Sequence, residues 1–169
     1  MSRLRRIAQT NRIFFTTTNL HPNAPRLRPF EMDLILSRIH ATQAHRKFVL
    51  IAYVVMPDHV HLLFLTNHEF LSKIMHHWKF QTGYVIQRHR SFSGHLWQAR
   101  YFDFICRRPR DVYDKLRYIH KNPVAAKFVA NPELWKWSSA AHYCGCPSNT
   151  LLPPDQINLH VQHVLLAGA

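Results

Sequence analysis

The chain has 169 residues, 47% of them hydrophobic, which is enough for one globular domain with a core of its own. Its 22 Lys and Arg residues outnumber its 9 Asp and Glu residues, and the resulting net charge of +13 favours a polyanionic partner. The N-terminus has no apolar core of a signal peptide, and no apolar run is long enough to cross a membrane, so we expect a cytoplasmic protein. Its three cysteines, Cys106, Cys144 and Cys146, are then expected to be reduced.

The first half of the chain alternates between strand and helix patterns. Residues 12–19 (RIFFTTTN) are rich in aromatic and β-branched side chains and predict a strand. After a loop rich in Pro and Arg, a helix is expected over about Phe30–His45. Residues 47–66 are too apolar and β-branched for a surface helix and a Pro-Asp pair interrupts them, so they predict a hairpin with strands near 48–56 and 59–66.

The second half continues the alternation. An apolar stripe at helical spacing predicts a long helix over 71–90 whose other face is basic. A strand is expected over 96–106, and Asp111 then has the position of an N-cap before a helix that Pro123 ends or kinks. The remaining residues have the pattern of short helical turns followed by a tail.

The order of these elements, β-α-β-β-α-β-α, indicates an α+β fold. It is typical of a ferredoxin-like antiparallel sheet with helices packed against one face. The sequence contains no internal repeat, low-complexity block or domain boundary. We therefore expect a single domain over 1–169, with its core at about 10–143 and a C-terminal tail at 144–169.

Two histidines one residue apart interrupt the apolar run VVMPDHVHLLF. Alternate side chains of a strand share a face, so His59 and His61 could both reach one divalent ion while Val60 and Leu62 point into the core. The pair could equally be two half-buried histidines bonded to neighbouring groups. The histidine-triad nucleotide hydrolases are disfavoured, because Leu63 stands where their next histidine would be.

A tyrosine on the last predicted helix is a candidate nucleophile. Tyr118 lies well off the apolar stripe of that helix, so core packing does not explain it. Asn122 follows four residues later on the same helical surface, although the proline after it biases it away from helical geometry. Together they could present a phenol and an amide oxygen to one site, or they could be an exposed tyrosine and a helix-ending asparagine.

Three ordered segments resemble the single-tyrosine HUH transposases, and most closely the branch associated with repetitive extragenic palindromes (REP). They are YVVMPDHVHLLF, LWQARYFDF and LRYIHKNPVAAKFVANPELWKWSS, and the resemblance spans roughly residues 10–143. It implies that His59 and His61 are the HUH histidines, and that Tyr118, which opens YIHKNP, is the nucleophile. It also implies that Asn122 assists at the metal, and Asp58 stands where relatives carry Asn, Asp or Glu.

The resemblance further implies a cofactor, a substrate and a reaction. Members of this family hold Mg²⁺ or Mn²⁺ with the two histidines and act on single-stranded DNA that contains a folded hairpin, from repetitive extragenic palindromes or transposon ends. Tyr118 would attack the phosphorus and leave a 5′-phosphotyrosine and a free 3′-OH. Two nitrogen donors would also suit Zn²⁺, so the residues alone leave the metal open.

Basic side chains on the second long helix and before the last one are candidate DNA contacts, with salt-sensitive affinity. They are Lys73, Lys79, Arg88, Arg90, Arg107, Arg108 and Arg110. Any one of them can also be an ordinary solvated charge. Trp97, Tyr101 and Phe102 could stack on unpaired bases, although such residues are more often part of a core. The segment HYCGC (142–146) lacks the paired cysteine spacing of a zinc site.

Three functions remain open at this point. The first is an active nickase and strand-transferase for single-stranded DNA. The second is a hairpin-binding protein that no longer cleaves. The third is an HUH replication or mobilisation nuclease, which the short chain and the YIHKNP motif disfavour. The sequence also leaves open whether the protein is a monomer or a homodimer, with Tyr118 acting in its own subunit or in the partner's.

Overall fold

A four-stranded antiparallel sheet in the order β2-β3-β1-β4 is the framework of the protein. The computed structural model describes residues 11–46, 48–91, 93–146, 151–153, 156–157 and 161–162. Its elements are β1 (Ile13–Asn19), α1 (Pro29–Arg46), β2 (Val49–Val55), β3 (His59–Leu65), α2 (Leu71–Arg90), β4 (Phe102–Cys106), α3 (Pro109–Ala125), the 3₁₀ turn η1 (Pro132–Leu134) and α4 (Ala140–Tyr143). The predicted order of strands and helices and the ferredoxin-like α+β class are confirmed.

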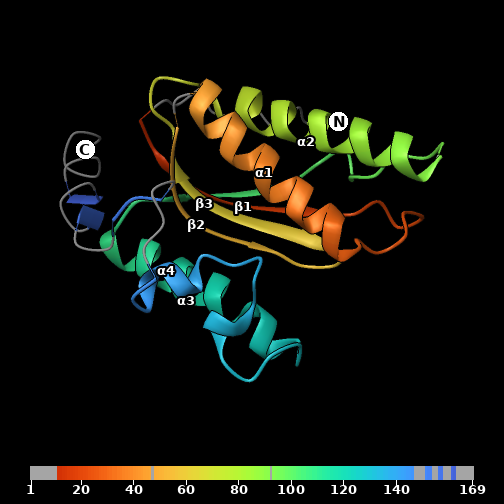
Figure 1. Cartoon of the computed structure of the whole chain (residues 1–169). Helices are drawn as coiled ribbons and strands as arrows, with labels where there is room; N and C mark the ends of the chain where they lie inside the picture. The colour runs from red at the N-terminus through yellow and green to blue at the C-terminus, as the bar shows by residue number, and fades with distance from the viewer. Residues whose placement is uncertain are drawn as a thin grey trace.

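Helices cover both faces of this sheet (Figure 1). On one face lie α1 and α2, and the apolar stripe of α2 from Leu71 to Trp78 is buried there. On the other face lies α3, which buries Val112 and Ile119. The expectation that the helices share one face is therefore wrong for α3. The physical reason is that β2 and β3 are apolar on both of their faces, so each face needs a cover.

The strand that carries the two histidines is in the middle of the sheet. β3 pairs with β2 on one side and with β1 on the other, and Thr17 of β1 stands opposite His61. Val60 and Leu62 are buried in the cluster under α1 and α2, as the alternation predicts. The histidines consequently face the side of the sheet that α3 covers.

The last strand is shorter than expected. Only Phe102–Cys106 pairs with β1 as a strand, whereas the preceding residues form an irregular segment that contacts the last residue of β1 and the residue after it. There Trp97 makes a single bridge with Leu20, and the Gln98 N–H donates to the Asn19 carbonyl over 3.0 Å. The apolar and aromatic composition of 96–101 is explained by packing of Leu96 and Trp97 under α2 and not by a strand.

The boundaries of α3 also differ from the expectation. Arg108 is the N-cap, and Asp111 lies inside the first turn, where its carboxylate accepts the N–H groups of Arg107 and Arg108, each over 3.0 Å. Asp111 therefore caps the helix from within, because its side chain satisfies donors that have no partner in the helix itself. At the other end, Pro123 is buried inside α3, which continues to Ala125. Asn122 thus keeps helical geometry.

The described part of the C-terminal tail belongs to the fold. Leu152, Ile157 and Val161 are buried in the cluster on the α3 side of the sheet. The Leu152 N–H donates to the Leu50 carbonyl of β2 over 3.2 Å. Across the described residues, no helix combines the length and apolarity that crossing a bilayer requires.

Candidate active site

The two histidines meet on the α3 side of β3. The ring centroids of His59 and His61 are 4.6 Å apart. His61 is buried and its ring stacks on Phe15 of β1, whose centroid lies 5.3 Å away, whereas His59 is partly open at the start of the strand. The strand therefore brings two imidazoles together at the edge of the covered face.

A neighbouring side-chain oxygen lies within hydrogen-bond distance of Nδ1 of each imidazole. The Asp58 carboxylate lies 2.6 Å from Nδ1 of His59, and the Thr17 hydroxyl lies 2.9 Å from Nδ1 of His61. A carboxylate can only accept, so the neutral form of His59 that a metal requires has its proton on Nδ1 and its lone pair on Nε2. Oxygen partners of this kind orient metal-binding histidines, and both imidazoles can direct Nε2 at a common point.

Asn122 of α3 supplies a third polar group at that point. Its Oδ1 is 3.2 Å from Nε2 of His59 and its Nδ2 is 3.3 Å from Nε2 of His61. The amide nitrogen faces His61, so when His59 is neutral the amide oxygen and the lone pair on Nε2 of His59 face each other as two acceptors. A cation between them would remove this conflict.

The spacing of these donors suits a small divalent ion. Neighbouring ligands of an octahedral ion with bonds of about 2.1 Å are roughly 3 Å apart, close to the separations around Asn122. No group of three or more His, Cys, Asp and Glu side chains could hold a metal among the described residues. The third candidate ligand beside the two imidazoles is the amide oxygen of Asn122. The candidate ligands His59, His61 and Asn122 are thus brought together and fit the ion.

The electrostatics keep His61 neutral. Burial, followed by the nearby His59 and Lys115, lowers the pKa of His61 to about 3. A neutral imidazole is the form that binds a metal, because the ligand is a free lone pair. His61 therefore meets this requirement throughout the physiological pH range.

The candidate nucleophile stands beside the same group. Tyr118 is 51% exposed, and its ring centroid is 5.2 Å from that of His61 and 5.8 Å from that of Phe15. It lies one helical turn before Asn122 on α3. The structure therefore places an accessible phenol next to the proposed metal ligands within one subunit.

Sequence reasoning missed a cation in this neighbourhood. Lys115 lies one turn before Tyr118 on α3, and its Nζ is 4.7 Å from the ring centroid of Phe15 and 4.8 Å from that of Phe104. The positive charge of Lys115 contributes to lowering the pKa of His61. The spacing of three residues from Tyr118 could have identified Lys115, since side chains at i and i+3 share a helix surface.

Four of the seven basic candidates occupy α2 and differ in their surroundings. Lys73 is exposed beside Glu69 at 3.5 Å, and Arg88 is exposed beside Tyr84, whose hydroxyl is 3.0 Å from Nη1. Lys79 is partly buried and donates to the carbonyls of Gln98 and Ala99. These three lie on the surface or at its border.

Arg90 is a correction to the expected basic surface. Its side chain is only 4% exposed and forms an ion pair with the fully buried carboxylate of Glu31 on α1. The same guanidinium donates to the carbonyls of Pro25 and Arg26 over 2.9 and 2.8 Å. Its role in this structure is to connect α2 with α1 and the loop before it, which leaves no face for a DNA phosphate.

The remaining basic candidates lie where β4 joins α3. All three are exposed, and two have an acidic neighbour on the same helix: Arg108 is 3.3 Å from Asp111 and Arg110 is 3.6 Å from Asp114. Ion pairs this exposed contribute little stability, so breaking them costs little and their arginines can bind a phosphate instead. The three arginines are Arg107, Arg108 and Arg110.

The aromatic candidates and the residues of HYCGC include both buried and exposed side chains. Trp97 is buried and donates its indole N–H to Thr82 over 2.9 Å, so it belongs to the core, whereas Phe102 is 57% exposed. Tyr101 is partly buried at the border. In HYCGC, His142 is buried and its Nε2 lies 3.1 Å from the Leu152 carbonyl.

Comparison with known proteins identifies the family of this chain. Residues 31–122 match the family described as "Transposase IS200 like". A REP-associated tyrosine transposase of Escherichia coli is 25% identical over 142 residues, covering 82% of this chain and 82% of that protein. A Haemophilus influenzae protein named "Putative REP-associated tyrosine transposase" is 25% identical over 150 residues, covering 82% of this chain and 85% of that protein.

A solved structure shares the fold. The structure of a REP-associated tyrosine transposase bound to a REP hairpin has a TM-score of 0.72 and 22% identity, over 90% of this chain and 91% of that chain. The names of these relatives confirm the resemblance seen in the sequence. The matched segment is more than half of the chain and contains both histidines, Tyr118 and Asn122. The chain therefore belongs to the IS200-like transposase family.

Proposed function

We propose that the protein binds single-stranded DNA at a folded hairpin, such as a repetitive extragenic palindrome, and that it cuts and rejoins the strand through Tyr118. One observation carries the proposal: the phenol of Tyr118, the amide of Asn122 and the imidazoles of His59 and His61 converge from two elements far apart in the sequence. The hairpin in the related solved structure supports the choice of substrate.

The proposed step is a transesterification. The Oη atom of Tyr118 attacks the phosphorus, a new P–O bond forms to the phenol, and the bond between phosphorus and the 3′ oxygen breaks. The phenol proton passes to solvent, and the 3′ oxygen leaves as a hydroxyl after taking up a proton. Attack by a second 3′-OH reverses the step, so the covalent bond retains the energy needed for rejoining.

The residues around Tyr118 have separate parts in this step. A Mg²⁺ or Mn²⁺ ion held by His59, His61 and Asn122 would withdraw charge from the scissile phosphate. Lys115 supplies a fixed positive charge on the same helix surface as the phenol. Phe15 supports the rings of both His61 and Tyr118 and so holds the nucleophile against the ligand group.

A covalent adduct tests the proposal. A hairpin oligonucleotide labelled at its 3′ end is incubated with protein and Mn²⁺, and denaturing gels then report label attached to protein. We expect Tyr118→Phe to abolish the adduct without loss of hairpin binding, because only the attacking oxygen is removed. Tyr113→Phe on the same helix is the matched control and should form the adduct.

The position of the label tests the chemistry further. A 5′-phosphotyrosine keeps the 3′-labelled fragment on the protein and releases a 5′-labelled fragment that ends in a 3′-OH. Chelation with EDTA should stop both products. An adduct that survives Tyr118→Phe contradicts the assignment, and hairpin binding without cleavage by the wild-type protein would favour the non-cleaving alternative.

A further inference from the structure

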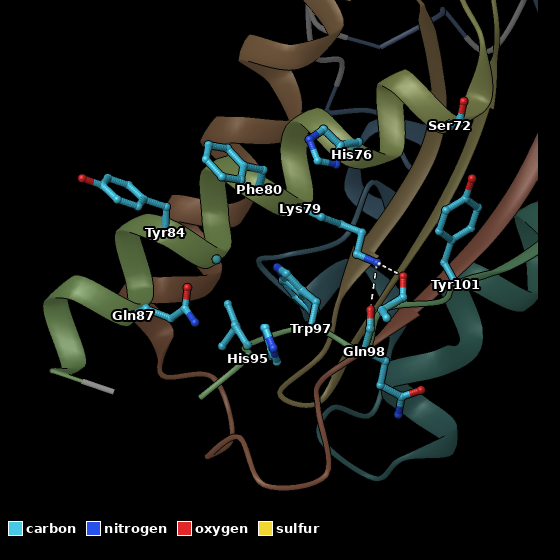
Figure 2. Close-up of a pocket in the computed structure, with 13 residues that line it drawn as sticks. Ser72, His76, Lys79, Phe80, Tyr84, Gln87, His95, Trp97, Gln98 and Tyr101 are labelled. Carbon is cyan, nitrogen blue, oxygen red and sulfur yellow. Dashed lines mark hydrogen bonds between the residues drawn. The ribbon is translucent and has the colours of Figure 1, made fainter. Parts of the chain in front are cut away.

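A groove lies between α2 and the segment 95–101, on the side of the sheet opposite α3. Its volume is about 340 Å³. Figure 2 shows side chains of α2 along one wall and residues such as His95 and Tyr101 along the other. None of the described residues that line it is acidic. The catalytic proposal above uses no part of this groove.

Three rings form a ladder on the wall made by α2. His76, Phe80 and Tyr84 are spaced four residues apart and so share one face of the helix. The ring centroids of His76 and Phe80 are 6.0 Å apart at 20°, and those of Phe80 and Tyr84 are 6.3 Å apart at 15°. Phe80 is 59% exposed and Tyr84 is 51% exposed. Phe80 and Tyr84 are therefore not part of the core, and their rings are open to a ligand.

Two cations accompany the rings. The Arg88 guanidinium lies 5.6 Å from the centroid of Tyr84 and extends the ladder by one more turn of α2. Lys79 crosses the groove, with its Nζ 2.9 Å from the Gln98 carbonyl and 5.5 Å from the Tyr101 ring centroid (Figure 2). It fixes the second wall in place against α2. Aromatic faces next to positive charge, without carboxylates, fit unpaired nucleotides, whose bases stack and whose backbone is anionic.

The chain connects this groove with the active-site face. The segment 95–101 continues directly into β4, whose first residue, Phe102, is 57% exposed. The Phe102 ring is 6.3 Å from that of Phe15, which contacts both His61 and Tyr118. β4 is an edge strand, so a DNA strand leaving the groove can pass around that edge.

We propose that the groove binds the unpaired nucleotides that flank the hairpin of the substrate, with bases stacked on Phe80 and Tyr84 and the backbone beside Arg88. The identity of the substrate rests on the function proposed above, whereas the location of this binding site rests on the groove itself. The groove then holds the flank while the strand passes around β4 towards Tyr118.

Fluorescence anisotropy tests the proposal with two labelled probes. One is a hairpin with unpaired flanks on both sides, and the other is the same hairpin without flanks. Both are titrated in EDTA, so that cleavage does not consume them. We expect the Phe80→Ala/Tyr84→Ala protein to bind the flanked hairpin roughly tenfold or more weakly, because two stacking faces are lost, and to bind the flankless hairpin like the wild type.

The matched control is Phe70→Ala, which removes an exposed ring at the start of α2 outside the groove and should leave both affinities unchanged. Equal losses for the two probes, or no loss for the flanked one, would overturn the proposal. A shift in elution volume without a change in DNA affinity would also overturn it, by making the groove a contact between copies of the chain.

Adduct formation separates this proposal from the proposed function. If the wild-type protein forms the Tyr118 adduct and the double variant binds the flanked hairpin with wild-type affinity, only the groove proposal is refuted. If the wild-type protein forms no adduct but the double variant binds the flanked hairpin more weakly than the wild type does, the groove proposal is supported and the catalytic proposal is contradicted.

Discussion

At the scale of single residues, the orientation of His61 depends on a hydroxyl from the next strand. Thr17 stands opposite His61 in the sheet, and its Oγ1 lies 2.9 Å from Nδ1. Thr17→Val keeps the shape and the strand propensity but removes this partner. We expect the dissociation constant for Mn²⁺ to rise by about tenfold or more, as when other oxygen partners of metal-binding histidines are removed. Isothermal titration calorimetry with Mn²⁺ in the absence of DNA measures it directly.

The control for this prediction is the next residue of the strand. The Thr18 hydroxyl points to the opposite face of the sheet and is buried without a hydrogen-bond partner. Thr18→Val should bind Mn²⁺ like the wild type, so any loss specific to Thr17→Val reflects the contact with His61. Equal affinity for Mn²⁺ in all three proteins would show that Thr17 does not orient the ligand.

Sequence patterns could predict which candidate site residues lie close together, but not the groups that support them. Period two on a strand relates His59 to His61, and a separation of four on a helix relates Tyr118 to Asn122, so local geometry is sufficient for each pair. Thr17 contacts His61 only because of the register between β1 and β3, which a local pattern does not encode. Supporting groups such as Thr17 therefore cannot be predicted from local sequence patterns, because their position depends on the pairing of distant strands.

At the scale of elements, the buried pair of Arg90 and Glu31 joins α2 to α1. Both side chains are almost fully buried. Arg90→Met would leave the carboxylate of Glu31 buried without its counter-charge, and we expect a loss of about 3–5 kcal/mol in the free energy of unfolding at neutral pH. Arg88→Met, two residues earlier and exposed, should change it little. Urea denaturation followed by circular dichroism measures both, and similar small losses would contradict the structural role of Arg90.

The same pair predicts how stability depends on acid. Burial alone would raise the pKa of Glu31, but hydrogen bonds from Arg90 and from the Arg28 N–H hold it below its usual value. The carboxylate therefore stabilises the fold above the unfolded-state pKa of about 4.3, and this contribution disappears as the pH falls through the lower folded-state pKa. In Arg90→Met the pKa of Glu31 should instead be raised, so acid would no longer remove stability through this group. Urea titrations across the acidic range distinguish the two slopes.

The elements that sequence patterns misjudge are those whose composition has a second explanation. Residues 96–101 have the apolar and aromatic character of a strand, yet the pairing with β1 does not continue before Phe102, and Trp97 packs under α2 instead. Pro123 normally disfavours a helix, yet it is buried in α3 and the helix continues past it. In both places tertiary packing decides against the local preference, and in the second it keeps Asn122 within reach of the histidines.

At the scale of the whole molecule, some basic side chains are held in contacts within the protein and others are exposed to solvent. Of the basic candidates, Arg90 is enclosed in an ion pair and Lys79 holds the wall of the groove. Arg107, Arg108 and Arg110 stand exposed at the start of α3, the helix that carries the nucleophile. A net charge of +13 favours a polyanionic partner in general, and we expect this exposed arginine group to contact the DNA backbone.

The salt dependence of binding tests this arrangement. Each phosphate contact releases condensed counterions, so Arg107→Gln should reduce the slope of log affinity against log salt by about 0.7–0.9 if Arg107 neutralises one phosphate. The loss should be similar for hairpins of different sequence, because a phosphate carries no base identity. Lys136→Gln is the control, because it removes one exposed positive charge beside Asp33 of α1, outside the arginine group, and its slope should match the wild type. Anisotropy titrations over a range of NaCl concentrations give the slopes, and an unchanged slope for Arg107→Gln would place the DNA backbone elsewhere on the molecule.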